Sequence, residues 1–313
     1  MADFHPDLSA ARFFPRFSFG PRMAWLLRGL GRWSRPGPTS GVTVTTLGVP
    51  GAPGGPEVML RIYRPDGLVA PAPALLWMHG GGFIIGDPTQ DEASSAAFAT
   101  SLGIVVAAVT YRLAPDAPFP APLDDCYAGL KGLYANAAAL GVDPERIAVG
   151  GNSAGGGLAA GLALLAHDRR EVPVRFQLLV YPMLDDRTVT RTDIDASALR
   201  VWSVESNRYG WTSYLGQAPG SDAVSPYAAP ARRAELAGLP PAWIGVGTLD
   251  LFHDEDVAYA TRLEAAGVAC DLTVIPGAYH GFDVIAPKAA VSRAFRDAQL
   301  QALRAALAIP PAA

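Results

Sequence analysis

Short, solidly apolar segments recur along this chain, and their spacing limits what it can fold into. They lie at 74–78, 104–109, 147–149, 176–181, 242–246 and 272–275. Apolar runs of this length, rich in β-branched residues and bounded by Gly, Pro or Asp, are typical of parallel strands that are covered on both faces. Helical stretches separate them, at 124–139, 154–167, 254–266 and 289–307. The alternation predicts an α/β fold with a doubly wound, mostly parallel central sheet and helices on both faces.

Two regions depart from this rhythm. Residues 58–63 alternate apolar and other side chains, which predicts an early, half-buried antiparallel strand. After Tyr181-Pro182, about sixty residues pass before the next clear strand. Because so long a loop without structure is unusual, we expect an excursion above the sheet that is helical in part.

The first forty residues combine aromatic and leucine side chains with arginines, and include Phe13, Phe17, Trp25 and Trp33. Two interpretations stay open, a helix that packs over a pocket of the protein and a basic amphipathic segment that lies on a membrane. We expect the first, since the rest of the chain is acidic. Residues 1–313 then form one domain, with a cap built from about 1–40 and about 185–225.

Charge and cysteine content exclude several classes of function. The 25 basic and 29 acidic residues leave a net charge of −4, without the basic excess of nucleic-acid-binding proteins. Cys126 and Cys270 are too few for a disulfide framework and wrongly spaced for a zinc site. The first residues lack signal-peptide character, and no segment has ~18 uninterrupted apolar residues. We therefore expect a cytoplasmic protein without stable membrane insertion.

The sharpest local pattern is Gly151-Asn152-Ser153-Ala154-Gly155, between an expected strand and an expected helix. A serine on such a tight strand-to-helix turn is the arrangement of a nucleophile elbow, in which flanking glycines leave room for strained backbone. The alternative is a glycine-rich phosphate loop. The segment lacks the Gly-Lys-Ser/Thr ending and the dinucleotide fingerprint of such loops, so we expect Ser153 to be a nucleophile.

A second glycine-rich segment, His79-Gly80-Gly81-Gly82, follows the expected strand 74–78. Glycines at such a position let backbone N–H groups point into a site, where they and the N–H of Ala154 are candidate donors to an oxyanion. His79 could be a catalytic base or could hold the loop by hydrogen bonds, and we expect the second role.

A serine nucleophile needs a histidine base and an acid, and in a nucleophile-elbow fold they follow the serine in the order acid, histidine. His280 lies on an expected loop after strand 272–275, reached by a short turn at 276–279. Asp250 comes straight after strand 242–246 and a turn at 247–249, so we expect it at the carboxyl edge of the sheet. Its rivals Asp254, Glu255 and Asp256 begin the next helix, where acidic residues commonly cap the helix or favour its dipole. His253 beside them also allows a metal site, but no second cluster completes a coordination shell.

Taken together, these stretches resemble the bacterial hormone-sensitive-lipase family of esterases. The resemblance covers roughly residues 42–308 and rests on His79-Gly80-Gly81-Gly82, Tyr111-Arg112-Leu113-Ala114-Pro115, Phe119-Pro120-Ala121, Gly151-Asn152-Ser153-Ala154-Gly155-Gly156, Asp250 and Tyr279-His280-Gly281-Phe282. Asn152 departs from the family, which usually has Asp or Thr at that position.

The resemblance implies an α/β-hydrolase fold with a helical cap, and a carboxylesterase or lipase-like enzyme that needs no cofactor. It implies that Ser153, Asp250 and His280 form a triad, and that Gly81, Gly82 and Ala154 donate the oxyanion hydrogen bonds. The partner is then a small-molecule ester of short to medium acyl chain, hydrolysed through an acyl-enzyme. No nucleic acid is expected, and a homodimer is the assembly to consider.

Two other functions stay open at this point. A ligand-binding relative such as the plant gibberellin receptor lacks the catalytic histidine, and the presence of His280 argues against that class. Lactones, amides or carbamates could be hydrolysed at the same site, because substrate choice depends on the pocket and the cap and not on the fold.

Overall fold

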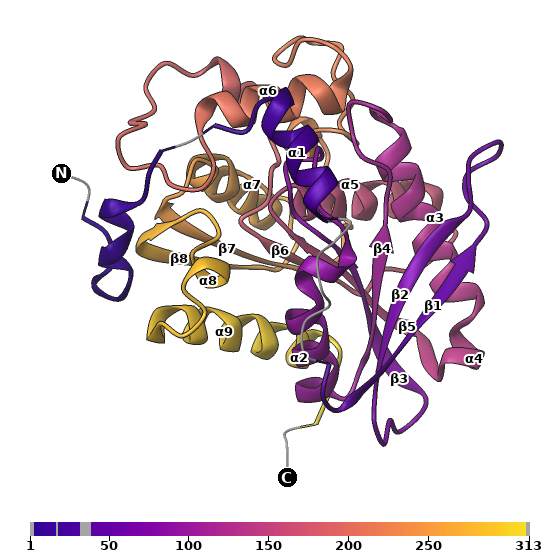
Figure 1. The fold of residues 1–313 in the computed structure, drawn as a ribbon. Helices are drawn as coiled ribbons and strands as arrows, with labels where there is room; N and C mark the ends of the chain where they lie inside the picture. Colours follow the sequence, from indigo (N-terminus) through magenta and orange to yellow (C-terminus); the bar gives the residue numbers. More distant parts are fainter. Residues whose placement is uncertain (1–2, 17, 32–38, 311–313) are drawn as a thin grey trace.

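A single mixed sheet organises the computed structural model, which describes residues 3–16, 18–31 and 39–310 (Figure 1). Within those residues the sheet has eight strands in the order β1-β2-β4-β3-β5-β6-β7-β8. They are β1 (Val42–Val49), β2 (Val58–Pro65), β3 (Ala72–Met78), β4 (Val105–Thr110), β5 (Val142–Asn152), β6 (Phe176–Val180), β7 (Ala242–Leu249) and β8 (Cys270–Tyr279). β2 is antiparallel to β1 and β4, and every other pair is parallel. The predicted early antiparallel strand and the mostly parallel sheet are confirmed.

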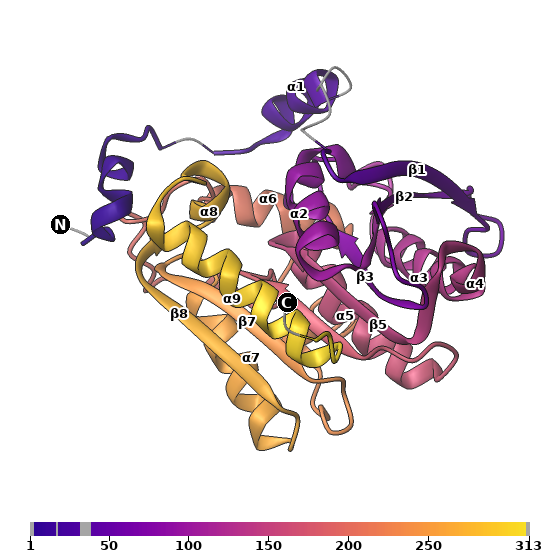
Figure 2. The same ribbon diagram turned by 90° about the horizontal axis from the view of Figure 1, so that it is seen from below.

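Helices cover both faces of this sheet (Figure 2). On one face α3 (Ala121–Ala135), α4 (Ala137–Leu140), α5 (Ala154–Arg169) and α7 (His253–Ala265) bury leucines such as Leu130, Leu162 and Leu263. On the other face lie α2 (Glu92–Leu102), α8 (Phe282–Ile285) and α9 (Ala290–Ala306), which bury Phe98 and Phe295. All seven residues of β3 are buried, because the strand lies between two neighbours and under helices on both sides. This explains why the central strands are solidly apolar.

Two strands extend further than the sequence pattern indicates. The expected turns at 247–249 and 276–279 are instead the last residues of β7 and β8. After an irregularity between Gly247 and Leu249, the two strands pair again at Leu249 and Tyr279. Asp250 and His280 therefore each follow directly on a strand end, and both lie at the carboxyl edge of the sheet.

The long excursion between β6 and β7 is helical in part, as expected. It contains the short helix η3 (Asp186–Thr190), α6 (Val204–Leu215) and η4 (Pro230–Arg232). Its ends are joined by an ion pair between the partly buried Arg232 and the buried Asp186, in which Arg232 Nε lies 2.5 Å from Asp186 Oδ1. The buried rings of Trp211 and Tyr214 fasten α6 to Phe83, the residue that follows the glycines after β3.

The N-terminal region forms two short helices instead of one. η1 (Pro6–Phe13) lies at the β8 edge, where the N–H of His5 donates to the carbonyl of Gly277 at 2.9 Å. α1 (Pro21–Gly31) lies near the loops after β3 and β4, since Arg28 Nε donates to the carbonyl of Ile84 at 2.6 Å (Figure 1). Phe13 and Trp25 are 82% and 77% exposed and are not packed over a pocket. Phe17 and Trp33, two other aromatic residues of the expected N-terminal cap, lie outside the described residues.

Candidate active site

Ser153 occupies the turn between β5 and α5 in a backbone conformation that residues other than glycine rarely adopt. Its φ is 56° and its ψ is −122°. A conformation of this kind costs of the order of 1–3 kcal/mol and persists only where the surroundings hold it. Here the Ser153 N–H donates to Val180 O at 2.9 Å, and its carbonyl accepts from the N–H groups of Gly157 and Met183, both at 3.0 Å. These bonds hold the strained turn.

The glycines around the serine are required by close packing. A Cβ placed on Gly151 would lie 2.4 Å from the backbone of Gly155, and one placed on Gly155 would lie 2.1 Å from the carbonyl oxygen of Met78. Both distances are far below a normal contact, so a side chain at either position would push the turn away from the end of β3. This is the physical reason for the glycine-serine-glycine spacing.

Ser153, His280 and Asp250 are joined in one hydrogen-bonded series. His280 Nε2 lies 3.0 Å from Ser153 Oγ, and His280 Nδ1 lies 2.8 Å from Asp250 Oδ2. The second carboxyl oxygen of Asp250 accepts from the Phe252 N–H at 3.0 Å. The Asp250 side chain is fully buried, and the His280 side chain is 7% exposed. The series can therefore move a proton from the serine to a fixed imidazole whose far nitrogen faces a buried carboxyl group.

Two aromatic rings hold the imidazole from the sides. Tyr181 and Phe252 each meet His280 edge to face, with ring centroids 4.8 and 5.1 Å away. Tyr181 itself has a φ of 36°, and its hydroxyl donates to Asp283 Oδ1 at 2.8 Å. These two supports were not predicted from the sequence. For Tyr181, its place directly after a buried strand and before a proline was the available signal.

The three rival acids serve other contacts. Asp254 is half exposed and pairs with Arg191 at 2.7 Å and with its neighbour His253 at 2.8 Å. Glu255 is buried and accepts from the N–H groups of Leu184 and Asp185 at 2.7 and 3.1 Å, so it fastens the start of the excursion. Burial raises the pKa of Glu255 to about 8.

Asp256 is also buried, and neither of its carboxyl oxygens has a hydrogen-bond partner among the described residues. Burial raises its pKa well above the ordinary value. Asp254, Glu255 and Asp256 do lie in the first turn of α7, as expected, but Glu255 and Asp256 are buried there. In the described part of the chain, no three His, Cys, Asp or Glu side chains group as they would around a metal ion.

The glycine loop after β3 is held beside the elbow. A Cβ on Gly80 would lie 3.1 Å from the carbonyl oxygen of Asn152, the residue before the serine. Gly81 and Gly82 have φ values of 121° and 59°, which favour glycine. Within the described residues, no hydrogen bond uses the N–H of Gly81, Gly82 or Ala154 as donor. These three N–H groups are therefore available to an acceptor on a bound molecule.

The loop is packed from above by the excursion. A Cβ on Gly82 would lie 2.1 Å from the ring of Trp202, and one on Gly210 of α6 would lie 2.9 Å from the carbonyl oxygen of Gly82. Trp202 is buried and stacks on Phe19 of the N-terminal region, with ring centroids 5.5 Å apart. Trp202 thus lies between a candidate oxyanion glycine and the N-terminal region, an arrangement that no local pattern predicted.

His79 stabilises this loop, as expected for a structural histidine. Its Nδ1 lies 2.7 Å from the carbonyl oxygen of Gly80, and its ring stacks on Tyr111 at 4.2 Å. The Tyr111 hydroxyl donates to the His79 carbonyl at 2.7 Å. Burial lowers the pKa of His79 to about 4, so the ring is neutral at physiological pH.

Among the helices of the described residues, none has the length and apolar character that a membrane span requires.

Comparisons with known proteins found similar sequences and similar structures. The pattern of the family described as alpha/beta hydrolase fold matches residues 75–284. The chain is 37% identical over 243 residues to carboxylesterase NlhH of Mycobacterium tuberculosis, with 75% of each chain covered. It is 35% identical over 231 residues to an ethyl acetate hydrolase of Pseudomonas putida, covering 73% of this chain and 72% of that protein. A bacterial heroin esterase of known structure superposes with a TM-score of 0.90 at 41% identity, over 97% of this chain and 98% of the other.

Proposed function

Since the chain belongs to the hormone-sensitive-lipase family of α/β hydrolases and is an enzyme of the esterase class, we propose that it cleaves short- to medium-chain carboxylic esters through an acyl-enzyme on Ser153. The observation that carries the proposal is the series of hydrogen bonds from Ser153 Oγ through His280 to Asp250, at 3.0 and 2.8 Å. A nucleophile, a base within reach of its proton and an acid that orients the base are the three groups that acyl transfer needs.

In the first half of the reaction, Ser153 Oγ attacks the ester carbonyl carbon while its proton passes to His280 Nε2. The carbonyl oxygen becomes an oxyanion, which accepts hydrogen bonds from the free N–H groups of Gly81, Gly82 and Ala154. Asp250 stabilises the imidazolium ion that forms. When the tetrahedral intermediate collapses, the bond to the alcohol oxygen breaks and His280 returns the proton to the leaving alcohol.

In the second half, a water molecule gives a proton to His280 and its oxygen attacks the acyl-enzyme carbonyl. The same N–H groups stabilise the second oxyanion. Collapse then releases the carboxylic acid, and His280 returns the proton to Ser153. The α5 helix begins at Ala154, and the positive end of its dipole favours the negative charge of both intermediates. This sequence needs no cofactor.

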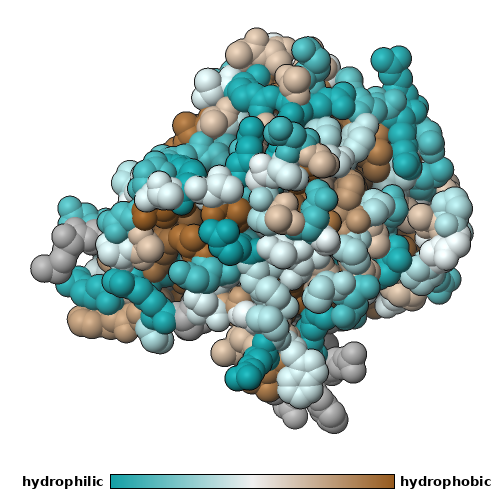
Figure 3. All heavy atoms as spheres, turned by 90° about the horizontal axis from the view of Figure 1, so that it is seen from above, coloured by the Kyte–Doolittle hydropathy of each residue, from teal (hydrophilic) through white to brown (hydrophobic). Residues whose placement is uncertain are grey.

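A preference for compact acyl groups is supported by the packing above the site. We propose that the N-terminal region and the excursion act together as the cap, with Trp202 against Gly82 limiting the space beside the oxyanion loop. Seen from above, the molecule has a hydrophobic patch bordered by hydrophilic side chains, with smaller hydrophobic areas elsewhere on the same face (Figure 3). The names of an ethyl acetate hydrolase and a carboxylesterase among the relatives agree with an ester substrate.

The experiment that tests the proposal is a screen of p-nitrophenyl esters from acetate to dodecanoate, together with matched anilides and lactones. We expect turnover of the esters, with kcat/KM highest for acyl chains of two to six carbons. Ser153→Ala is the matched control, and its folding is checked by circular dichroism. Preferred turnover of the anilides or lactones, or ester hydrolysis by Ser153→Ala within a few-fold of wild type, would contradict the proposal.

A further inference from the structure

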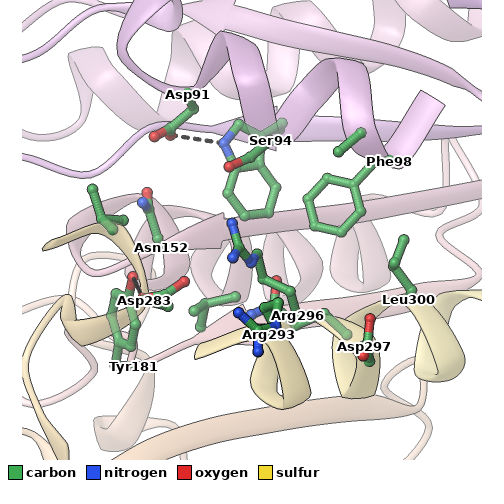
Figure 4. Close-up of a pocket in the computed structure, with 15 residues that line it drawn as sticks. Asp91, Ser94, Phe98, Asn152, Tyr181, Asp283, Arg293, Arg296, Asp297 and Leu300 are labelled. Atoms are coloured by element: carbon green, nitrogen blue, oxygen red, sulfur yellow. Dashed lines mark hydrogen bonds between the residues drawn. The ribbon is translucent and has the colours of Figure 1, made fainter. Parts of the chain in front are cut away.

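A cavity of about 330 Å³ lies between α2 and α9, on the face of the sheet away from α5 (Figure 4). Its apolar walls are the rings of Trp77 and Phe98 with Val180 and Leu300. The volume is within the range of small-molecule sites, about 300–1,000 Å³, and equals that of roughly eleven water molecules. None of Ser153, His280 and Asp250 lines it, so it is separate from the proposed substrate site.

Two buried carboxyl groups line this cavity. Asp91 accepts from Trp77 Nε1 at 2.9 Å, and Asp283 accepts from the Tyr181 hydroxyl at 2.8 Å. Asp91 is 7% and Asp283 is 9% exposed, and in the described structure neither forms an ion pair with a lysine or arginine. Burial raises the pKa of Asp91 to about 6 and also raises the pKa of Asp283. A positively charged group placed beside these two carboxyl groups would favour their ionised form.

Positive charge is placed at the mouth of the same cavity. Arg293 and Arg296 extend from α9 between the two helices, with Asp297 beside them (Figure 4). Their guanidinium groups donate to the carbonyl oxygens of Lys288 and Pro287, which hold them at the mouth. A cation alone would have to pass these arginines, and an anion alone would be repelled by the carboxylates deeper inside.

A buried side chain in the wall lacks a partner. Gln299 is 3% exposed, and its Nε2 has no hydrogen-bond partner among the described residues. A buried donor without an acceptor is costly and uncommon in native proteins. An occupant that carries an acceptor oxygen would satisfy it.

We propose that this cavity is a second binding site, which takes a zwitterionic amino acid with an apolar side chain. The ammonium group lies between Asp91 and Asp283, and the carboxylate lies toward Arg293, Arg296 and the free donor of Gln299. The apolar side chain packs on the two aromatic rings. A zwitterion satisfies both signs of charge, which neither a simple amine nor a simple acid can do.

The site shares walls with the catalytic machinery. Asn152 lines the cavity and directly precedes Ser153, and Tyr181 lines it while its ring supports His280. Asp283 follows His280 by three residues. We therefore expect that an amino acid bound in the cavity changes kcat for ester hydrolysis. This expectation rests on the proposed esterase function, whereas the proposed binding is independent of that function.

Isothermal titration calorimetry with L-phenylalanine at pH 7 tests the binding directly. We expect one site per chain, with a Kd at least tenfold lower than that of 2-phenylethylamine, which lacks the carboxylate, and of 3-phenylpropionate, which lacks the ammonium group. Saturating L-phenylalanine should raise the Tm by roughly 2 °C or more, because it binds only the folded state.

Two tryptophan substitutions on α2 provide a matched pair. Ala97 is exposed and lines the cavity, so Ala97→Trp should fill its mouth and abolish binding. Ala93 is exposed on the same helix but does not line the cavity, so Ala93→Trp should bind as wild type. In the ester assay, L-phenylalanine should change kcat of wild type and of Ala93→Trp at least twofold, and leave Ala97→Trp unchanged.

Three results would overturn the inference. They are the absence of both heat and a Tm shift with L-phenylalanine, wild-type binding of L-phenylalanine by Ala97→Trp, and equally tight binding of 2-phenylethylamine. Binding without any change in kcat would refute the coupling alone. Because calorimetry needs no ester, a failure of the proposed esterase function would leave the binding result readable by itself.

Discussion

Replacing Asp250 by Asn removes one charge from the most buried part of the proposed triad. The two oxygens of Asp250 have different partners, since Oδ1 accepts from the Phe252 N–H at 3.0 Å and Oδ2 faces His280 Nδ1 at 2.8 Å. In the Asn variant, the amide oxygen is the only group that can accept from Phe252, so the amide nitrogen turns toward His280. Nδ1 must then be the acceptor, the imidazole proton moves to Nε2, and Nε2 can no longer take the proton of Ser153.

The size of the loss follows from this change of tautomer. The equivalent change in a serine protease lowered turnover by about 10⁴-fold. We expect a loss of kcat on the order of 10²–10⁴, which corresponds to about 2.7–5.4 kcal/mol of transition-state stabilisation. The loss is nearer 10²-fold if the side-chain amide of the Asn variant rotates in a fraction of molecules. In those molecules the amide oxygen gives up its hydrogen bond from the Phe252 N–H and faces His280 instead.

The assay is kcat for p-nitrophenyl butyrate at pH 7, with folding monitored by circular dichroism. Asp254→Asn is the matched control, because Asp254 is the neighbouring acid that is half exposed and pairs with Arg191. We expect it to retain at least half of the wild-type kcat. If Asp250→Asn retained more than a third of wild-type kcat, or if Asp254→Asn were the more damaged variant, the assignment of the acid would be wrong.

Two further changes test the surroundings of the site. Burial raises the pKa of Glu255 from 4.5 to about 8, so ionisation of Glu255 destabilises the folded state. The protonated side chain makes its whole contribution to stability below pH 4.5, and this contribution is lost as the pH rises toward 8. The free energy of unfolding of wild type should therefore fall relative to Glu255→Gln between pH 5 and 8 in denaturant titrations, and parallel profiles would contradict this. Trp202→Ala should lower kcat for p-nitrophenyl acetate roughly tenfold, because it removes the ring that holds the oxyanion loop. It should also shift the chain-length optimum to longer acyl groups, because the same ring limits the space beside that loop. The exposed Trp25→Ala is its control, and an unchanged profile in Trp202→Ala would count against the cap.

The fold was predictable because its information is local. A central strand such as β3 is buried on both sides, so it must be apolar along its whole length, and this leaves a direct mark in the sequence. The elbow is equally local, since Gly151, Ser153 and Gly155 lie within five residues and their spacing reflects one tight turn. Chain order and strand ends then led to Asp250 and His280, which the structure brings to hydrogen-bonding distance of each other.

The features that sequence analysis missed depend on packing between distant segments. Glu255 and Asp256 look like ordinary first-turn acids of a helix, yet both are buried, and Glu255 binds backbone N–H groups at the distant start of the excursion. The contact of Trp202 with Gly82 joins residues 120 positions apart, and no periodicity marks it. The N-terminal aromatics form a strong sequence pattern, yet Phe13 and Trp25 are exposed, because the region breaks into two short helices that pack in different places.

The central claim is that Ser153 is the nucleophile, and covalent labelling tests it most directly. The protein is incubated with a p-nitrophenyl phosphonate ester, which transfers its phosphonyl group to an activated serine and releases p-nitrophenol. We predict one mass increment per chain, loss of activity in proportion to labelling, and a modified peptide that contains Ser153. His280→Ala should label far more slowly, because no base then takes the serine proton. Labelling at Ser94, Ser197 or any other serine, with Ser153 unmodified, would contradict the account.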